Sequence, residues 1–185
     1  MGMGHDDIGA APTRPNVILT GFMATGKSTV GRVLAGRLRY GFVDTDRIIE
    51  ERHGPIPVIF AEQGEAAFRL IERALAEELA GLSSLVISTG GGMLLDPAVA
   101  DVMASSGIVV CLTAEPEVIL RRVGGARAGE RRPLLAGGDP LDRIVQLLGE
   151  RAAAYARFPQ VATDGRTPTE ISSAIEDVLH GGSAG

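Results

Sequence analysis

Cysteine, tryptophan and lysine are almost missing from this 185-residue chain, which has one cysteine, no tryptophan and a single lysine. One cysteine, Cys111, excludes an internal disulfide and a cysteine-rich metal cluster, and its apolar neighbours predict a buried core residue. Aromatic residues make up only 4% of the chain, so stacking platforms for nucleic-acid bases are not expected. The formal net charge of −5 also lacks the basic excess of a nucleic-acid-binding face. We therefore expect no nucleic-acid partner.

Long apolar runs are missing as well. No stretch approaches the ~18 apolar residues of a membrane span, and the opening MGMGHDDIGAAPTRP lacks the apolar core of a secretory signal. With 45% apolar and 22% charged residues, the composition is that of a globular protein, and the length fits one domain. We expect a disordered tail over 1–15, a single domain over 16–180 and a loose tail over 181–185. No membrane partner and a cytoplasmic location are expected.

Short apolar runs alternate with helical patterns along this domain. The runs predict strands at 16–20, 41–45, 85–88 and 108–112, and a weaker fifth strand at 160–163. Apolar spacing predicts helices over 28–38 and 65–80. Further helix starts are indicated by Asp96-Pro97, by Asp139-Pro140 and by a capping box from Thr167 to Glu170. Apolar strands that alternate with helices predict an α/β fold, in which helices cover both faces of a parallel sheet.

The segment GFMATGKST, from Gly21 to Thr29, fits the phosphate-loop spacing G-x-x-x-x-G-K-[ST]. It lies between a predicted strand and a predicted helix, the context in which such a loop binds phosphates. Its backbone N–H groups and the helix N-terminus favour anionic oxygens, while Lys27 reaches the β- and γ-phosphates and Ser28 can bind Mg²⁺. The alternative is a glycine-containing turn that binds no ligand.

Lys27 is the only lysine among 18 lysines and arginines. Arginine is a planar fork, whereas lysine is a compact charge on a flexible stem. A tight loop around a triphosphate has room for lysine and not for arginine, which explains why lysine occurs here. Chance placement of a rare residue is the alternative.

Two aspartates, Asp44 and Asp46, follow the second predicted strand in the segment VDTDRIIEE. Extended geometry would point both side chains to the same side, at the strand end where open α/β sheets place ligands. One carboxylate could serve Mg²⁺ through water, and the other could accept a hydroxyl proton. The alternative is an exposed aspartate, Asp46, that caps the following helix, a role compatible with function.

Two glycine-rich segments complete the set of candidate site residues. Gly90, Gly91 and Gly92 follow the third predicted strand, where missing side chains let the backbone approach a ligand; a flexible turn is the alternative. The segment 123–138 carries Arg127, Arg131 and Arg132. It is typical of a lid that brings positive charge over a transferring phosphate, or else of a solvated arginine-rich loop.

In order, GFMATGKSTVGR, VDTDRIIEERHG, IFAEQGEAAFRLIE, STGGGML, RRPLLAG and RAAAY resemble the shikimate kinase family over residues 16–180. The resemblance implies a three-layer α/β/α P-loop fold of the nucleoside-monophosphate-kinase-like branch, with a central five-stranded parallel sheet. It implies transfer of a phosphoryl group from ATP to the 3-hydroxyl of shikimate, in the pathway to chorismate and the aromatic amino acids. It further implies a monomer that uses Mg²⁺, with a substrate-binding segment at about 44–73 and a lid at about 124–138.

The resemblance also assigns residues to roles. Lys27, Asp46 as base, and the lid residue Arg132 would be catalytic. The implied ATP contacts are Ala24, Thr25, Gly26, Lys27, Ser28, Thr29, Arg122, Arg132 and Arg166. The implied shikimate contacts are Asp46, Arg69, Gly90, Gly91, Gly92 and Arg151. Ser28, and Asp44 through water, would hold the metal.

The sequence departs from the family pattern in two places. Ala24-Thr25 replaces the more usual Gly-Ala or Gly-Ser, and we expect ordinary backbone dihedrals at Ala24 and a slightly stiffer loop. The lid is longer, so that Arg131 could take the place of Arg132. The alternatives for the whole chain are another small-molecule kinase, such as a gluconate or nucleotide kinase, and an ATP-binding regulator without turnover.

Overall fold

The computed structural model describes residues 14–124, 135 and 138–181. Its strands are β1 (Asn16–Thr20), β2 (Gly41–Asp44), β3 (Leu85–Ser88), β4 (Gly107–Thr113) and β5 (Gln160–Ala162). They form one sheet in the order β2-β3-β1-β4-β5, and all neighbouring strands run parallel. Each strand therefore ends at the same edge of the sheet, where the loops that follow the strands gather.

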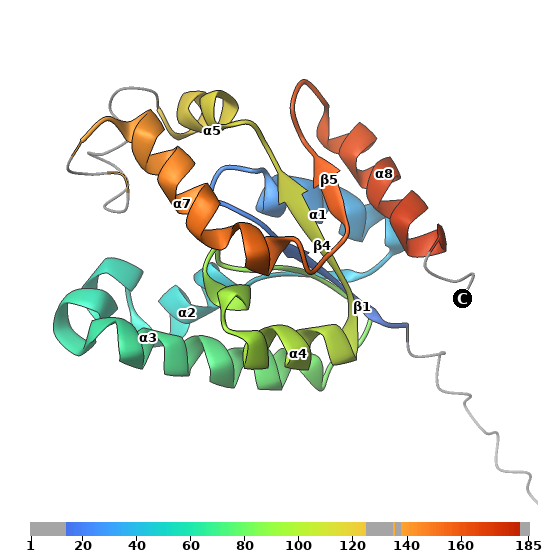
Figure 1. Ribbon diagram of the computed structural model, residues 1–185. Helices are drawn as coiled ribbons and strands as arrows, with labels where there is room; N and C mark the ends of the chain where they lie inside the picture. The colour runs from blue at the N-terminus through green and yellow to red at the C-terminus, as the bar shows by residue number, and fades with distance from the viewer. Residues whose placement is uncertain (1–13, 125–134, 136–137, 182–185) are drawn as a thin grey trace, which may run out of the picture.

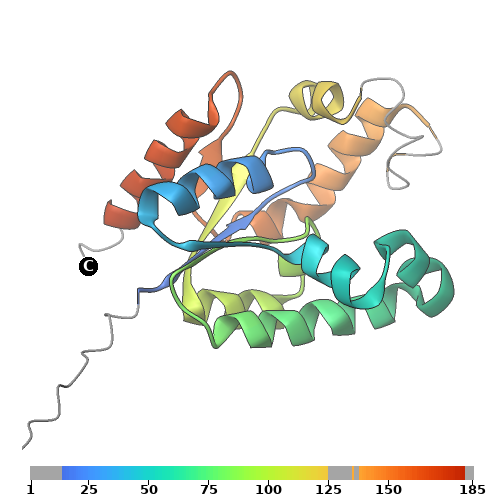
Figure 2. The ribbon, with the colours of Figure 1, turned by 180° about the vertical axis from the view of Figure 1, so that it is seen from behind.

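Helices cover both faces of this sheet (Figures 1 and 2). They are α1 (Lys27–Leu38), α2 (Thr45–His53), α3 (Ile56–Ala80), the short 3-10 helix η1 (Met93–Leu95), α4 (Pro97–Ser106), α5 (Pro116–Val123), α7 (Pro140–Tyr155) and α8 (Pro168–Gly181). Helices α1 and α8 pack together on one face, and α3 and α4 pack together on the other. The predicted three-layer α/β fold with a five-stranded parallel sheet is confirmed. No helix in the described part of the chain is both long and apolar enough to cross a bilayer.

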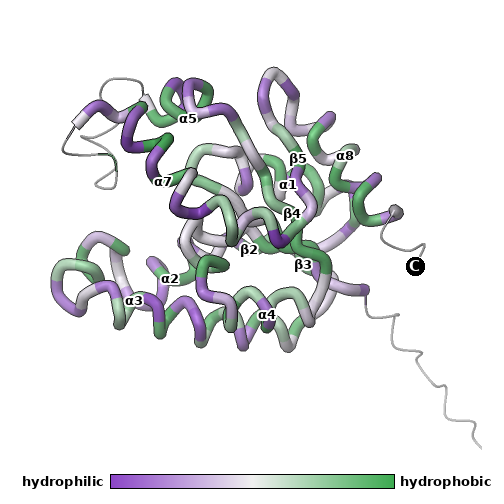
Figure 3. The backbone as a smooth tube through the Cα atoms, viewed as in Figure 1, coloured by the Kyte–Doolittle hydropathy of each residue, from purple (hydrophilic) through white to green (hydrophobic). Residues whose placement is uncertain are grey.

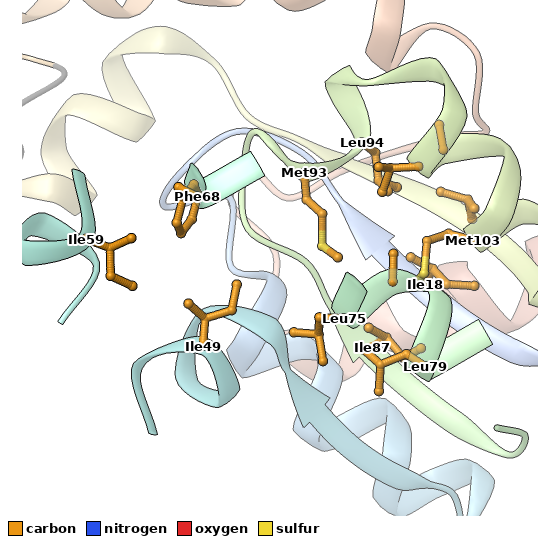
Figure 4. Close-up of a cluster of buried hydrophobic side chains, with 14 residues drawn as sticks. Ile18, Ile49, Ile59, Phe68, Leu75, Leu79, Ile87, Met93, Leu94 and Met103 are labelled. Atoms are coloured by element: carbon orange, nitrogen blue, oxygen red, sulfur yellow. The ribbon is translucent and has the colours of Figure 1, made fainter. Parts of the chain in front are cut away.

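The core lies between the sheet and these helices. On the α3 and α4 face, Ile18 and Ile87 of the sheet contact Leu75, Leu79 and Met103 of the helices (Figure 4). The apolar residues lie along the strands and the inner helix faces, while the hydrophilic residues lie on outer turns and loops (Figure 3). Burial of this apolar area is the main favourable term in folding.

The predicted helix starts and the predicted core cysteine are confirmed. Asp96 and Asp139 accept hydrogen bonds from the first backbone N–H groups of α4 and α7, and a proline follows each of them. Thr167 and Glu170 exchange the reciprocal hydrogen bonds of a capping box. Cys111 is fully buried.

Among the boundaries that the structure corrects, those of α3 and β2 bear on the site. Helix α3 begins at Ile56 rather than at residue 65, because a helical segment precedes Gly64, whose φ of 82° kinks the helix there. Strand β2 ends at Asp44, and Thr45 already begins α2. The N-cap of α2 is therefore Asp44 and not Asp46: the Asp44 side chain accepts a hydrogen bond from the N–H of Arg47. The spacing suggested that both aspartates lie in extended geometry, but Asp44 ends the strand and Asp46 lies in the helix that follows.

Candidate active site

The phosphate-loop sequence forms a turn between β1 and α1, as the spacing predicts. Gly21 has a φ of 129°, and a Cβ there would overlap the carbonyl oxygen of Leu112. Gly26 has a φ of 95°, and it leads directly into α1. Inside the turn, the buried Thr25 hydroxyl donates to the carbonyl of Phe22 at 2.8 Å. Both glycines are needed because side chains rarely adopt these dihedrals.

The expectation of ordinary dihedrals at Ala24 was wrong, because its φ is 59°. The left-handed conformation costs a residue with a Cβ about 1–2 kcal/mol. The loop accepts this cost because its curvature is set by the flanking strand and helix, not by the preference of one residue. Ala24 therefore keeps the same turn that a glycine would make.

Lys27 lies under this loop with a relative exposure of 9%. Its Nζ donates to the carbonyl oxygens of Gly21 and Phe22, at 2.8 Å each. Burial lowers the pKa of Lys27 from 10.5 to about 8, although the carboxylates of Asp46 and Asp44 oppose the shift. Lys27 therefore sits at a border between the charged and the neutral form near physiological pH.

This pKa predicts that ATP binds more weakly as the pH rises through about 8, because only charged Lys27 attracts phosphate. For one group with this pKa, the affinity falls roughly tenfold between pH 7 and pH 9. Calorimetric titration with Mg²⁺ and ATP, at fixed ionic strength and several pH values, measures this affinity. Cys111, whose pKa burial raises to about 11, stays protonated over this range.

The same pKa predicts that pH affects folding stability in the opposite direction to ATP affinity. The pKa of Lys27 is lower in the folded chain than in the unfolded chain, so the unfolded chain binds more protons between about pH 8 and 10.5. The contribution of Lys27 to the free energy of unfolding then rises with pH across that window. An ATP affinity that stays constant from pH 7 to pH 9 would contradict the prediction.

Oxygen atoms from three elements meet beside Lys27. The Ser28 hydroxyl at the start of α1 donates to Oδ2 of Asp44 at 2.6 Å and lies 3.2 Å from the hydroxyl of Ser88. Asp44 and Ser88 are register partners at the ends of β2 and β3. Hydroxyl and carboxylate oxygens are hard ligands of the kind that Mg²⁺ prefers, so these residues fit the predicted metal.

A cavity of about 270 Å³ opens between the phosphate loop and the strand ends. Its lining combines residues of both. They are Met23, Ala24, Gly26, Lys27, Ser28, Thr29, Asp44, Asp46, Ser88, Thr89 and Gly91. The structure thus brings most of the predicted phosphate-loop residues together with both predicted aspartates.

Gly90 makes room for Asp46, which lines this cavity. A Cβ at Gly90 would overlap Oδ1 of Asp46, and it would come within 3.3 Å of Oε1 of Glu72. The Gly90 N–H donates to the hydroxyl of buried Thr45, at 2.9 Å, which fixes the glycine against the start of α2. The missing side chain at this position therefore accommodates a protein carboxylate.

Replacing Gly90 with alanine is expected to lower turnover about tenfold to hundredfold, because displacing a reacting group by about 1 Å has effects of this size. Steady-state kinetics of phosphoryl transfer measures this loss of turnover. Gly149 is the matched control, since it is exposed on α7 and a Cβ there meets nothing within 4 Å. Gly149→Ala should keep full turnover and raise stability by up to ~1 kcal/mol. Equal turnover in the two variants would refute the role of Gly90.

Arg69 projects from α3 beside Gly92. A Cβ at Gly92 would come within 2.8 Å of Nη1 of Arg69. Arg69 pairs with Glu72 at 2.6 Å and with Glu65 at 2.8 Å, and the Glu72 side chain is almost fully buried. Burial raises the pKa of Glu72 and the Arg69 guanidinium opposes that shift. The two carboxylates orient the guanidinium towards the glycine segment.

Arg151 projects from α7 and reaches the same segment. Its Nη1 donates to the carbonyl of Gly91, at 3.3 Å, and its guanidinium lies 5.2 Å above the ring of Phe22. The three glycines therefore separate three side chains, with Asp46 against Gly90, Arg151 against Gly91 and Arg69 against Gly92. Two guanidinium groups can bind the carboxylate of a small anion, and an aspartate beside them can accept hydrogen bonds from hydroxyl groups of the same molecule.

The remaining predicted residues lie elsewhere. Arg122 on α5 is exposed and donates to the carbonyl of Ala24, at 3.1 Å, and to Thr163, at 2.9 Å, so it borders the phosphate loop. Arg166 donates to carbonyls of Ala162 and Glu170 in the turn between β5 and α8, and it does not line the cavity. Arg127, Arg131 and Arg132 lie outside the described residues, as does most of the predicted lid.

Sequence reasoning missed several residues of this site. Ser88 and Thr89 follow a predicted strand, and the expected meeting of strand ends could have indicated them. Glu72 stands three residues after Arg69, the spacing of neighbours on one helix face. Tyr155 ends the segment RAAAY, which carries part of the family resemblance, but its contact with Gly91 joins residues far apart in the chain and could not be read from that segment.

The fold and the site together define the class. A phosphate-loop sequence leads into α1, and two arginines and an aspartate lie beside the glycines that follow β3. This arrangement is that of the P-loop small-molecule kinases. A gluconokinase from Sinorhizobium meliloti has this fold, with a TM-score of 0.58 over 92% of this chain and 98% of its own, at 19% identity. The model of the family described as shikimate kinase matches residues 23–180. The chain belongs to the shikimate kinase family.

Two relatives illustrate this membership. A shikimate kinase from Pelotomaculum thermopropionicum is 43% identical over 166 residues, which cover 89% of this chain and 94% of that protein. The structure of a shikimate kinase from Acinetobacter baumannii in complex with shikimate has a TM-score of 0.85 at 32% identity. It covers 94% of this chain and 97% of its own.

Proposed function

We propose that this protein transfers the γ-phosphoryl group of ATP to the 3-hydroxyl of shikimate, giving 3-phosphoshikimate and ADP on the way to chorismate and the aromatic amino acids. The observation that carries the proposal is the arrangement of Asp46, Arg69 and Arg151 around the three glycines. Of this group, Asp46 and Gly91 line one cavity together with Lys27. Shikimate has one carboxylate and several hydroxyls, which match two guanidinium groups and one aspartate. Family membership supports the same acceptor.

The phosphate-loop pole would hold the nucleotide. The backbone N–H groups of Ala24, Thr25, Gly26 and Thr29 and the N-terminus of α1 favour phosphate oxygens, and Lys27 adds the positive charge at the β- and γ-phosphates. Arg122 would lie near the adenine because it contacts Ala24. Arg166 would be a further nucleotide contact, and Arg132 would bring charge to the transferring phosphate.

Ser28, and Asp44 through water, would hold Mg²⁺ together with the phosphates. Their oxygen atoms already lie in hydrogen-bond contact at 2.6 Å, a donor set that suits this metal. When bound, the metal neutralises charge that develops on the phosphates.

The glycine pole would hold shikimate. Arg69 and Arg151 would bind its carboxylate from two sides, and Gly90, Gly91 and Gly92 would leave room for its ring. Asp46 would accept a hydrogen bond from the 3-hydroxyl and take its proton as the oxygen attacks phosphorus. Phosphoryl transfer needs little covalent help, so positioning and charge neutralisation supply most of the rate. The family resemblance further supports a monomer that acts in the cytoplasm.

ADP release in the presence of ATP and Mg²⁺ tests the proposal. Shikimate, quinate, gluconate and a nucleoside monophosphate are supplied separately as acceptors. Turnover with shikimate alone is the expected result, and the new phosphate ester is located by ³¹P NMR. Turnover with gluconate or the nucleotide would identify a different small-molecule kinase. ATP binding without turnover on any acceptor would support a regulator.

A further inference from the structure

A buried tyrosine stands behind one of the proposed carboxylate-binding arginines. Tyr155 ends α7, one helical turn after Arg151, so that both side chains lie on the same face of the helix. Its hydroxyl donates to the carbonyl of Gly91 at 2.8 Å. Arg151 donates to that same carbonyl at 3.3 Å. The carbonyl has two lone pairs and can serve both donors, and the shorter bond is the one from Tyr155.

The contacts around Arg151 leave its guanidinium few alternative positions. The ring of Phe22 lies under the guanidinium at 5.2 Å, and the Gly91 carbonyl lies at its edge. Gly91 in turn packs against the phosphate loop, since a Cβ there would come within 3.4 Å of the Gly21 carbonyl. Gly91 is therefore the residue at which α7, the glycine segment and the phosphate loop meet, and its carbonyl is the atom that α7 contacts.

We propose that Tyr155 is a positioning residue for acceptor binding: its hydroxyl fixes the Gly91 carbonyl, and the fixed carbonyl orients Arg151 towards the carboxylate of the acceptor. This inference rests on the proposed function, because it needs an acceptor that carries a carboxylate. Without the hydroxyl, the carbonyl loses the shorter of these two hydrogen bonds, and Arg151 then donates to a less firmly held acceptor. Tyr155 itself does not touch the reacting atoms, so the chemical step is unchanged.

The variant Tyr155→Phe tests this role in steady-state kinetics with two acceptors, shikimate and its neutral methyl ester. We expect the KM for shikimate to rise roughly three- to tenfold, the range for one hydrogen bond, while kcat stays within about twofold. With the ester, which offers Arg151 no charge, we expect KM to change less than about twofold, a difference that general loosening of the fold would not produce. Tyr40→Phe, the same change at the other tyrosine, is the matched control.

A double-mutant cycle separates action through Arg151 from direct action. In an Arg151→Ala background, Tyr155→Phe is expected to leave the KM for shikimate unchanged, because the group it orients is gone. An equal KM penalty with and without Arg151, or an equal penalty on shikimate and its ester, would overturn the inference. So would an unchanged KM for shikimate in Tyr155→Phe.

Two further results keep the outcomes distinct. If Tyr155→Phe unfolds at the assay temperature, the kinetics are repeated at a lower temperature at which circular dichroism shows the variant to be folded. The same selective rise in KM for shikimate is expected there, and its absence would overturn the inference. If the wild-type protein does not phosphorylate shikimate at all, the proposed function itself fails and this inference fails with it. Wild-type turnover combined with a non-selective variant defeats the inference alone.

Discussion

Replacing Asp46 with asparagine is expected to lower kcat with shikimate by about 10²–10³, the scale for loss of a preorganised charged contact at the reacting group. The amide keeps the size of the side chain, so it still fits against Gly90, but it cannot take the proton of the acceptor hydroxyl. The KM for ATP should change little, because Lys27 and the loop amides remain. Stopped-time ADP release under saturating substrates measures the loss.

Asp142→Asn is the matched control for this variant. Asp142 lies in the first turn of α7, as Asp46 lies in the first turn of α2, so both changes remove an acidic residue from a helix N-terminus. The favourable interaction of that charge with the helix dipole, about 0.3–1 kcal/mol, is lost in both. Asp142→Asn should therefore keep normal turnover. A kcat for Asp46→Asn within a few-fold of wild type would exclude Asp46 as the base.

Replacing Lys27 with arginine is expected to abolish nearly all turnover while the protein still folds. Lys27 is buried, and its Nζ fits between the carbonyls of Gly21 and Phe22 at 2.8 Å each. A guanidinium is wider and planar, so it cannot enter that space and must turn into the cavity that the phosphates would occupy. The substitution keeps the positive charge, so a loss of turnover would result from the different shape of the arginine side chain.

The reverse exchange, Arg37→Lys, is the control for charge-preserving substitutions. Arg37 lies on the exposed side of α1, where it pairs with Glu176. An exposed pair of this kind contributes at most about 1 kcal/mol, so turnover should be normal and the melting temperature almost unchanged. Circular dichroism establishes folding of both variants. Lys27→Arg with near-normal turnover would mean that the single lysine stands at this position by chance.

Much of the fold follows from local signals in the sequence. The strands β1 and β3 were predicted with their observed bounds, because short apolar runs between polar turns usually form buried strands. The starts of α4 and α7 followed from an aspartate and a proline, whose preferences act within one turn of helix. These features depend on residues close together in the chain.

Other features could not be read from such neighbours. Ala24 adopts a φ of 59° although alanine disfavours it, because the loop is closed by the strand and helix on either side. The N-terminal part of α3 was missed because Gly64 breaks the helical pattern locally, while burial of Ile59 in the core holds that segment in place. In both places, packing outweighs a local preference of about 1 kcal/mol.

The sequence by itself determined the phosphate loop and the identity of the candidate charged residues, which rest on motifs of a few consecutive positions. It also determined the parallel sheet and the family, which rest on the alternation of apolar runs with helical patterns and on the order of the motifs along the chain. Only the tertiary structure decided which side chains lie against Gly90, Gly91 and Gly92. It places Asp46, Arg151 and Arg69 against three successive glycines, and it joins Tyr155 to Gly91 across 64 positions. Contacts of this kind depend on how helices pack across the end of the sheet, and spacing along the chain does not encode them.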